Sequence, residues 1–339
     1  MGIRCWEIRS LVLVLLGALG HSHGRLVFNV ETFGAQGDGL TDSTEVAPGA
    51  LLIAWTVGCD QRQPVVLLVP NGTFLIKPMT FHGPCRANIS LRSVRFEDCR
   101  HIKVTGVTIA DSPHFHLQFH RCNHVIALSL QIMAPSTSPR TDGIHVQQTR
   151  NVHILNTTIG TGDDCVSVGH GSANVTISGL MCGPGHGISI GSLGKRDTRA
   201  TVQNVLVDGA TLTGTENGLR IKTWQGGHGW ARNIAFRNIK MINVSNPIVI
   251  DQHYCDSPRP CANKTSAVKV SEVTFVGIQG TSRTDVAVRL ACSKYVPCEH
   301  ILLNDVSLRP FEEGGAVSSY CHNARGEANG EVKPPSCLS

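Results

Sequence analysis

The chain has 339 residues, of which 41% are hydrophobic and 16% charged, with 35 glycines and a formal net charge of +5. This composition is too apolar for a disordered chain, and it lacks the glycine period of collagen. Few charges and many glycines also argue against a helical bundle, whose surfaces favour glutamate, lysine and alanine.

The first 24 residues have the pattern of a secretory signal peptide. Arg4 and Arg9 precede the apolar run 11–19, and small and polar residues follow it as far as Gly24. A signal anchor is the alternative, but the run is far shorter than the roughly 20 residues that a membrane-spanning helix needs. We therefore expect a cleaved leader at 1–24, a mature chain at 25–339, and a secreted, extracellular protein that leaves the membrane.

Cysteines and glycosylation sequons in the mature chain agree with secretion. Cys5 is the one cysteine of the leader, so cleavage leaves an even number for disulfide formation. N-linked glycans are expected at some of six Asn-x-Ser/Thr sequons, which begin at Asn71, Asn88, Asn156, Asn174, Asn243 and Asn263. A mildly positive chain also suits an acidic polymer as its partner.

A helix is expected near residues 44–57, although Pro48 and Gly49 interrupt that stretch. From residue 100 onwards a short phrase recurs in which apolar and polar residues alternate, as in a strand with one buried face. Its eight copies begin their apolar part at residues 102, 125, 152, 175, 205, 234, 273 and 301.

Short strands and glycine-rich turns that repeat with this period predict a parallel β-solenoid in which each repeat forms one coil. A β-sandwich or a propeller would show hairpin turns more regularly. Because coils bury a core only by stacking, we expect one elongated all-β domain. The helix near 44–57 would cap the N-terminal end of its core.

A second strand of the repeat begins with polar residues. Its apolar residues at 144, 166, 188, 219 and 248 are expected to face the core. Equivalent positions in successive coils lie about 4.8 Å apart, so the residues two positions earlier should form a ladder at the turn before each strand. The expected result is a groove lined by Asp142, Asp163, Asp164, His186, Arg220 and Lys222.

Taken singly, each of these side chains has an ordinary structural explanation, since aspartate beside glycine is common in turns. Three clustered carboxylates are different, because their repulsion must be offset by a metal ion, a shared proton or a function. Such a cluster suits either the binding of a hard cation or glycoside hydrolysis by a carboxylic acid and a water-activating carboxylate. Nearby arginine and lysine suit a negatively charged sugar.

Four motifs resemble, in order and spacing, the signature of the polygalacturonases of glycoside hydrolase family 28: Thr141-Asp142-Gly143, Gly162-Asp163-Asp164, Gly185-His186-Gly187 and Arg220-Ile221-Lys222. The resemblance extends from Phe33 to about Cys337 and looks like the plant branch. It implies a right-handed parallel β-helix, a single-stranded solenoid, that hydrolyses the α-1,4 bonds of polygalacturonate with inversion. It implies no metal and no cofactor.

The resemblance also assigns roles to the catalytic residues. Asp163 would be the general acid, Asp142 and Asp164 would hold and activate the water, and His186 would maintain the protonation of the acid.

Further positions that match the family would bind substrate. Arg220 and Lys222 would bind substrate carboxylates, and Glu216 and Tyr254 would touch the sugar. The expected partner is pectin, in the plant cell wall, and the expected state is a monomer that binds no nucleic acid. The family bridges Cys165 to Cys182, and three further bridges are expected at Cys255–Cys261, Cys292–Cys298 and Cys321–Cys337.

Two departures from the family pattern bear on activity. Arg140 stands where the family usually has asparagine, which places a long cation beside Asp142. Between about 92 and 95 the chain lacks a segment that relatives carry, so a shortened solenoid is expected. An impaired protein that binds pectin without turnover is therefore one alternative. Another is a calcium-dependent pectate lyase, against which the motifs at His186 and Arg220 argue.

Overall fold

The computed structural model describes residues 2–4, 20–22, 25–43, 49–69, 73–75, 85–86, 89–91 and 93–339. Most of the expected leader, residues 44–48 of the expected helix, and the sequons at Asn71 and Asn88 lie outside the described residues. No helix in the described part of the chain is long and apolar enough to cross a membrane.

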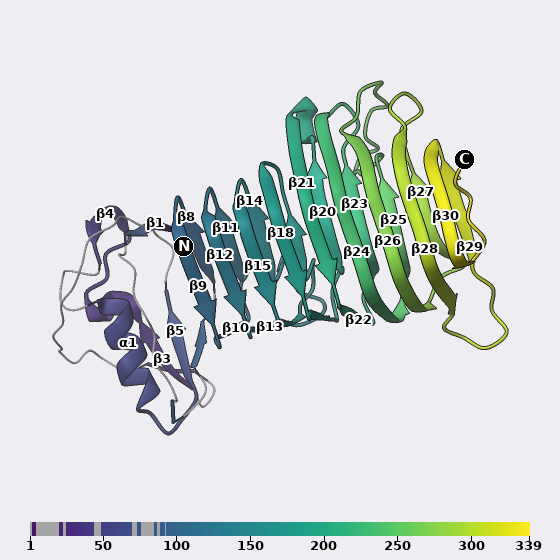
Figure 1. Ribbon diagram of the computed structural model, residues 1–339. Helices are drawn as coiled ribbons and strands as arrows, with labels where there is room; N and C mark the ends of the chain where they lie inside the picture. Colours follow the sequence, from purple (N-terminus) through teal and green to yellow (C-terminus); the bar gives the residue numbers. More distant parts are fainter. Residues whose placement is uncertain are drawn as a thin grey trace.

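The chain winds into a stack of coils that contribute strands to two large sheets (Figure 1). The first, sheet A, has 12 strands. In spatial order they are β4 (Asp38–Asp42), β6 (Thr73–Leu75), β1 (Gly2–Arg4), β8 (Val94–Glu97), β11 (Leu117–His120), β14 (Ile144–Gln147), β17 (Val166–Val168), β20 (Ile188–Leu193), β23 (Asn217–Thr223), β25 (Asn246–Asp251), β27 (Val286–Ala291) and β29 (Ser318–His322).

The second, sheet B, has 18 strands and covers the remaining sides of the coils. It contains β2 (Gly20–Ser22), β3 (Arg25–Asn29), β5 (Val65–Leu68), β7 (Ile89–Leu91), β9 (Arg100–Thr105), β10 (Thr108–Ala110), β12 (Asn123–Leu128), β13 (Gln131–Met133), β15 (Arg150–Leu155), β16 (Thr158–Gly160), β18 (Ser172–Ser178), β19 (Met181–Cys182), β21 (Arg199–Asp208), β22 (Thr211–Thr213), β24 (His228–Val244), β26 (Lys269–Ser282), β28 (Cys298–Pro310) and β30 (Ala324–Lys333). Long strands such as β24 turn a corner, since β24 pairs with both β21 and β22.

The register of sheet B confirms the sequence repeat residue by residue. The apolar residues that open the eight copies pair in parallel from coil to coil, and all eight are buried: Ile102, Val125, Val152, Val175, Val205, Ile234, Val273 and Ile301. Their stacking gives a continuous apolar column, and two residues further along β24 and β26 Phe236 and Phe275 stack with ring centres 5.2 Å apart. The predicted parallel β-helix is therefore confirmed.

Each coil turns before this apolar residue at a single position with positive φ. These corner positions are His101, His124, Asn151, Asn174, Asn204, Asn233, Glu272 and His300. Asparagine tolerates this left-handed conformation better than most residues. The amide of Asn204 also donates to Oδ1 of Asn174 over 2.9 Å and accepts from Asn233 over 2.8 Å. The asparagines of the phrase therefore form a hydrogen-bonded ladder along one corner.

The N-terminal end of the stack carries the expected helix (Figure 1). Helix α1 (Ala50–Cys59) begins after Gly49, whose φ of 56° is left-handed, and the Cys59–Cys85 disulfide fixes its end. Its buried residues Ile53 and Ala54 join the core beside the 3-10 helix η1 (Val30–Phe33). A second 3-10 helix, η2 (Lys195–Asp197), follows β20. The prediction of a capping helix is confirmed, with the helix ending at Cys59 rather than Val57.

Strand β1 occupies an unusual place in sheet A. It comes from the expected leader, yet it pairs in parallel with both β6 and β8 and so lies between them. The chain between β7 and β8 is where the sequence predicts that the family's additional segment is missing. Sheet A is therefore continuous from β6 to β8 only through β1, whose residues precede the expected cleavage site.

Candidate active site

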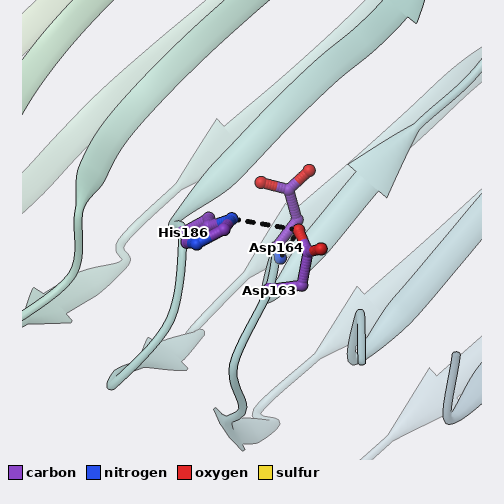
Figure 2. A group of neighbouring side chains, drawn as sticks. All are labelled: Asp163, Asp164 and His186. Atoms are coloured by element: carbon purple, nitrogen blue, oxygen red, sulfur yellow. Dashed lines mark hydrogen bonds and ion pairs between the residues drawn. The ribbon is translucent and has the colours of Figure 1, made fainter. Parts of the chain in front are cut away.

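Three turns at the beginning of neighbouring strands carry the predicted catalytic side chains. Asp142 precedes β14, Asp163 and Asp164 precede β17, and His186 precedes β20. Backbone bonds stack the turns, since Gly143 N–H donates to the carbonyl of Asp164 over 2.9 Å and His186 N–H to that of Asp163 over 2.8 Å. Figure 2 shows the two neighbouring aspartates on one coil and His186 on the next, with its ring directed at Asp163. The predicted ladder is confirmed.

The glycines around His186 allow this close stacking. Gly185 and Gly187 both have positive φ, at 146° and 86°. A Cβ on Gly185 would lie 2.6 Å from the carbonyl oxygen of Asp163, and one on Gly187 would collide with the carbonyl oxygen of Asn217. A larger residue at either glycine would therefore force neighbouring coils apart, and the Gly-His-Gly motif lets the imidazole lie close to the preceding coil.

Asp164 is the most strongly bonded of the three aspartates. It is almost fully buried, and its Oδ1 accepts from Ser189 Oγ and Arg220 Nη2, both over 2.8 Å. Its Oδ2 accepts from Lys222 Nζ over 2.7 Å. A buried carboxylate needs such compensation, because burial without a paired charge is costly. Arg220 and Lys222, predicted to bind substrate carboxylates, therefore also hold this aspartate in place.

Asp142 is buried and lies beside two other carboxylates. Burial raises its pKa to about 7, and the charges of Asp164 and Asp163 act in the same direction. Its Oδ2 accepts a 2.6 Å hydrogen bond from Ser167 Oγ, which has the opposite effect. The hydroxyl of Ser167 is in turn 2.7 Å from Nδ1 of His145, whose pKa is lowered by burial. Which of these two atoms donates to the other depends on the tautomer of His145.

Asp163 is the most accessible of the three aspartates. His186 Nδ1 lies 3.1 Å from its Oδ1, and His186 Nε2 lies 3.2 Å from Oε2 of Glu216. The contact with Asp163 raises the pKa of His186, against the effect of its burial. Burial raises the pKa of Asp163, but the hydrogen bond and charge of His186 outweigh it and leave that pKa below its ordinary value. Both shifts favour an ion pair between a protonated His186 and an ionised Asp163.

Tyr254 closes the cluster on the C-terminal side. Lys222 Nζ lies 5.4 Å from the centre of the Tyr254 ring, which meets Trp224 edge-on at 5.4 Å. Burial, assisted by the charge of Asp256, raises the pKa of Tyr254 to about 12. All eight residues predicted for the site therefore belong to one cluster, in which Glu216 and Tyr254 flank the charged centre.

The same cluster offers donor atoms of the kind that metal ions use. Ligand atoms of Asp163, Asp164 and His186 lie within 4.8 Å of one another. Both oxygens of Asp164 already accept from Lys222 and Arg220, however, and His186 faces Asp163. Protein cations therefore balance these carboxylates.

Three members of the cluster were not predicted from the sequence: Ser167, Ser189 and His145. The signal was present, because Ser167 and Ser189 stand between two buried residues in the aligned phrases Val166-Ser-Val and Ile188-Ser-Ile. A polar residue at that position lies on the outer face of sheet A, above the ladder of aspartates. Strict alternation along the strand was enough to find both serines.

The two remaining sequence features are also located. Arg140 is exposed and has a φ of 59°, a left-handed conformation that suits the asparagine usual in the family. The four predicted disulfides, Cys165–Cys182, Cys255–Cys261, Cys292–Cys298 and Cys321–Cys337, are all present.

A hollow of about 490 Å³ lies on sheet B, and its lining includes the asparagines of the ladder. It contains no residue of the cluster.

Comparison with known proteins identifies the family. A sequence profile of glycosyl hydrolases family 28 matches residues 91–332. A probable polygalacturonase of Arabidopsis thaliana is 38% identical over 378 aligned positions, covering 92% of this chain and 84% of its own. The polygalacturonase of Prunus persica is 40% identical, covering 92% of this chain and 94% of its own. The chain belongs to glycosyl hydrolases family 28.

The solved structure of a polygalacturonase from Erwinia carotovora is similar in fold to this family 28 chain. Its TM-score is 0.56 at 22% identity, and the match covers 89% of this chain and 80% of that one. The predicted right-handed parallel β-helix is thereby confirmed. The alignment to the Arabidopsis protein is longer than the whole of this chain, so that relative carries residues that this family 28 member lacks.

Proposed function

We propose that this glycoside hydrolase is a polygalacturonase, which hydrolyses α-1,4 bonds between galacturonate units with inversion at the anomeric carbon. The observation that carries the proposal is the cluster of Asp142, Asp163 and Asp164 with His186 at the ladder of sheet A. Two carboxyl groups on either side of a scissile bond are the machinery of glycoside hydrolysis. Relatives at 38% and 40% identity carry the name polygalacturonase.

The different environments of the three aspartates support different roles. Asp163 is accessible and in contact with His186, so it is placed to protonate the leaving oxygen as general acid. Asp142 and Asp164 are buried and fixed by Ser167 and by Arg220 and Lys222, so they would hold and activate the water. A water between two carboxyl groups is the arrangement that inversion requires.

In the substrate-free site the pKa values of Asp163 and Asp142 stand in the opposite order to the one these roles need. The pKa of Asp163 lies below its ordinary value while that of Asp142 is raised to about 7, yet the acid must carry a proton and the base must be ionised. Bound substrate would displace water from Asp163 and bring an anionic sugar beside it, and both effects raise the pKa of a carboxyl group. We infer that the proton shared by the carboxyl groups reaches Asp163 in the complex.

Binding of the anionic sugar would involve the cations and the flanking residues. Arg220 is partly exposed and the ring of Tyr254 lies beside Lys222, so a galacturonate carboxylate and sugar face could both be bound. We further propose that Lys222 contributes mainly its positive charge and that Glu216 contacts the sugar beside His186.

The remaining expectations concern where the protein acts. We propose cleavage of the leader at residues 1–24, secretion to the plant cell wall, and a monomer formed by one domain at 25–339 that binds pectin and no nucleic acid. Among the described sequons, Asn156, Asn174 and Asn263 are exposed and Asn243 is partly buried. Exposure at the first three supports the expectation of N-linked glycans.

The test of the proposal replaces the acid without changing its size. Asp163→Asn should abolish the release of reducing ends from polygalacturonate, because asparagine cannot donate a proton to the leaving oxygen. Far-ultraviolet circular dichroism should be unchanged, since the side chain is partly exposed. Asp197→Asn, at an exposed aspartate bound to Lys264, is the matched control and should keep full activity. Undiminished activity of Asp163→Asn would disprove its role.

A second candidate function is pectin binding without turnover. Arg140 beside the ladder and the place of β1 in sheet A are the observations that favour it. Purified mature protein that binds polygalacturonate but produces no new ends over long incubation would establish this alternative.

A further inference from the structure

The outer face of sheet A continues beyond the catalytic cluster as a row of in-register side chains. Parallel pairing relates Ser189 to Arg220, Arg220 to Val249, Val249 to Arg289, and Arg289 to Tyr320. Residues paired in this way point to the same side of the sheet. The row therefore runs along the coil axis from the site to β29, at the C-terminal end of the stack (Figure 1).

Arg289 is an exposed cation within this row. Its guanidinium lies 4.9 Å from the centre of the Tyr320 ring, and Tyr320 is itself 43% exposed. None of the ion pairs between described residues includes Arg289, whereas Arg220 is bound to Asp164. A cation–π contact uses the face of the guanidinium group and leaves its N–H donors able to bond elsewhere. The charge of Arg289 is therefore available to a ligand.

A second pair of a cation and a ring lies next to Arg289. Directly after β27, the loop closed by the Cys292–Cys298 disulfide carries Lys294, whose Nζ lies 5.8 Å from the ring centre of Tyr295. Tyr295 is 59% exposed. This end of sheet A therefore presents two positive charges, each beside an exposed tyrosine ring.

We propose that Arg289 and Tyr320 form a further binding site for an acidic sugar residue, on the C-terminal side of the catalytic cluster. Arginine binds a carboxylate through two parallel hydrogen bonds, and a tyrosine ring packs against the apolar face of a pyranose. Two strand spacings separate Arg220 from Arg289, or roughly 10 Å. A polyuronate that lies along the row would therefore bind at Arg289 while another of its residues occupies the catalytic cluster.

This inference rests on the proposed function, and its test uses substrate length. Arg289→Ala should raise KM for polygalacturonate and long oligogalacturonates about tenfold, as the loss of one charge-assisted contact does, with kcat unchanged. The shortest oligogalacturonates that are cleaved should show no change, because they do not reach the site. Arg289→Lys should recover part of the loss, since lysine keeps the charge but not the paired hydrogen bonds.

The control is Arg309→Ala, which removes an equally exposed arginine from β28 of sheet B. It should leave KM unchanged for every length. An equal KM of Arg289→Ala and the unmodified protein for all lengths would overturn the inference.

A measurement of substrate binding distinguishes a failure of the Arg289 inference from a failure of the proposed function. Asp163→Asn and Asp163→Asn/Arg289→Ala can be compared for their affinity for polygalacturonate by calorimetry, without turnover. A weaker affinity of the double variant supports the Arg289 site even in a protein that hydrolyses nothing. Equal affinities would overturn it even if the unmodified protein is an active hydrolase.

Discussion

At the scale of single residues, the balance of charge around Asp164 organises the site. This carboxylate is almost fully buried and accepts hydrogen bonds from Ser189, Arg220 and Lys222, so two cations offset the cost of its burial. The cations that would meet an acidic substrate therefore also hold the carboxylate that would activate water. Binding of substrate and placement of the base depend on the same side chains.

The energetic contribution of this buried pair can be measured. Lys222→Met removes the cation from Asp164 and leaves the carboxylate undercompensated, so the free energy of unfolding should fall by roughly 3 kcal/mol. The exposed pair of Lys264 and Asp197 is the matched control, and Lys264→Met should cost less than about 1 kcal/mol. Urea unfolding at pH 7 measures both. Equal losses in the two variants would show that burial does not govern the strength of the pair.

Asp142 should destabilise the fold once it is ionised. Its pKa is about 7 in the folded chain and close to 3.8 in an unfolded one, so the folded state favours the protonated form. The unmodified protein should therefore lose stability relative to Asp142→Asn as the pH rises from 4 to 7, by up to roughly 4 kcal/mol. Urea unfolding of both proteins at pH 4 and pH 8 measures the difference. A variant whose relative stability does not change with pH would contradict the raised pKa.

The sequence carried most of the catalytic residues but not the contacts between them. Asp142, Asp164 and His186 were predictable because they precede buried residues at equivalent positions of successive coils. The contact of Lys222 with Asp164 was not, because it depends on how long side chains cross from one coil to another. The contact between His145 and Ser167 depends on the packing of neighbouring coils, which a single sequence does not reveal.

At the scale of structural elements, each coil of sheet B turns at one residue with positive φ, which is asparagine in several coils. Asn204 has a φ of 56°, donates to Asn174 and accepts from Asn233. Asparagine at this position therefore meets two requirements, a left-handed backbone and hydrogen bonds along the stack.

Two substitutions separate these requirements. Asn204→Gly keeps the left-handed conformation and loses the bonds, so it should cost about 1 kcal/mol. Asn204→Ala loses both and should cost about 1 kcal/mol more. Thermal unfolding measures the stability of both variants relative to the unmodified protein. If Asn204→Gly were as damaging as Asn204→Ala, the backbone conformation would not be the reason for asparagine at the corner.

At the scale of the whole molecule, the two ends of the stack were not equally predictable. From β9 to β28, every coil repeats the phrase whose apolar residues pair in register, so the period alone predicted the solenoid. Residues 25–97 carry no such repeat, and their strands and capping helix are held together by pairings between distant segments. The pairing of β1 with β6 and β8 could not be foreseen from any local pattern.

Removal of the leader should therefore loosen the N-terminal end. Without β1, strands β6 and β8 lose the neighbour that accepts and donates their backbone hydrogen bonds. In the mature chain, amides of β6 and β8 should exchange with deuterium faster than those of β15, β18 and β21. Hydrogen exchange followed by mass spectrometry measures both groups. Equal protection of the two groups would mean that the N-terminal end of the solenoid is as stable without the leader as its central coils.

We propose that the aspartates and His186 of the ladder on sheet A hydrolyse polygalacturonate with inversion. Proton NMR of the first products from the purified mature protein tests it most directly, because the anomeric signal shows the configuration of each new reducing end before mutarotation. Inversion of an α-1,4 bond predicts that these ends appear first as the β-anomer. New ends that appear first as the α-anomer, an unsaturated product, or no new ends would contradict the account.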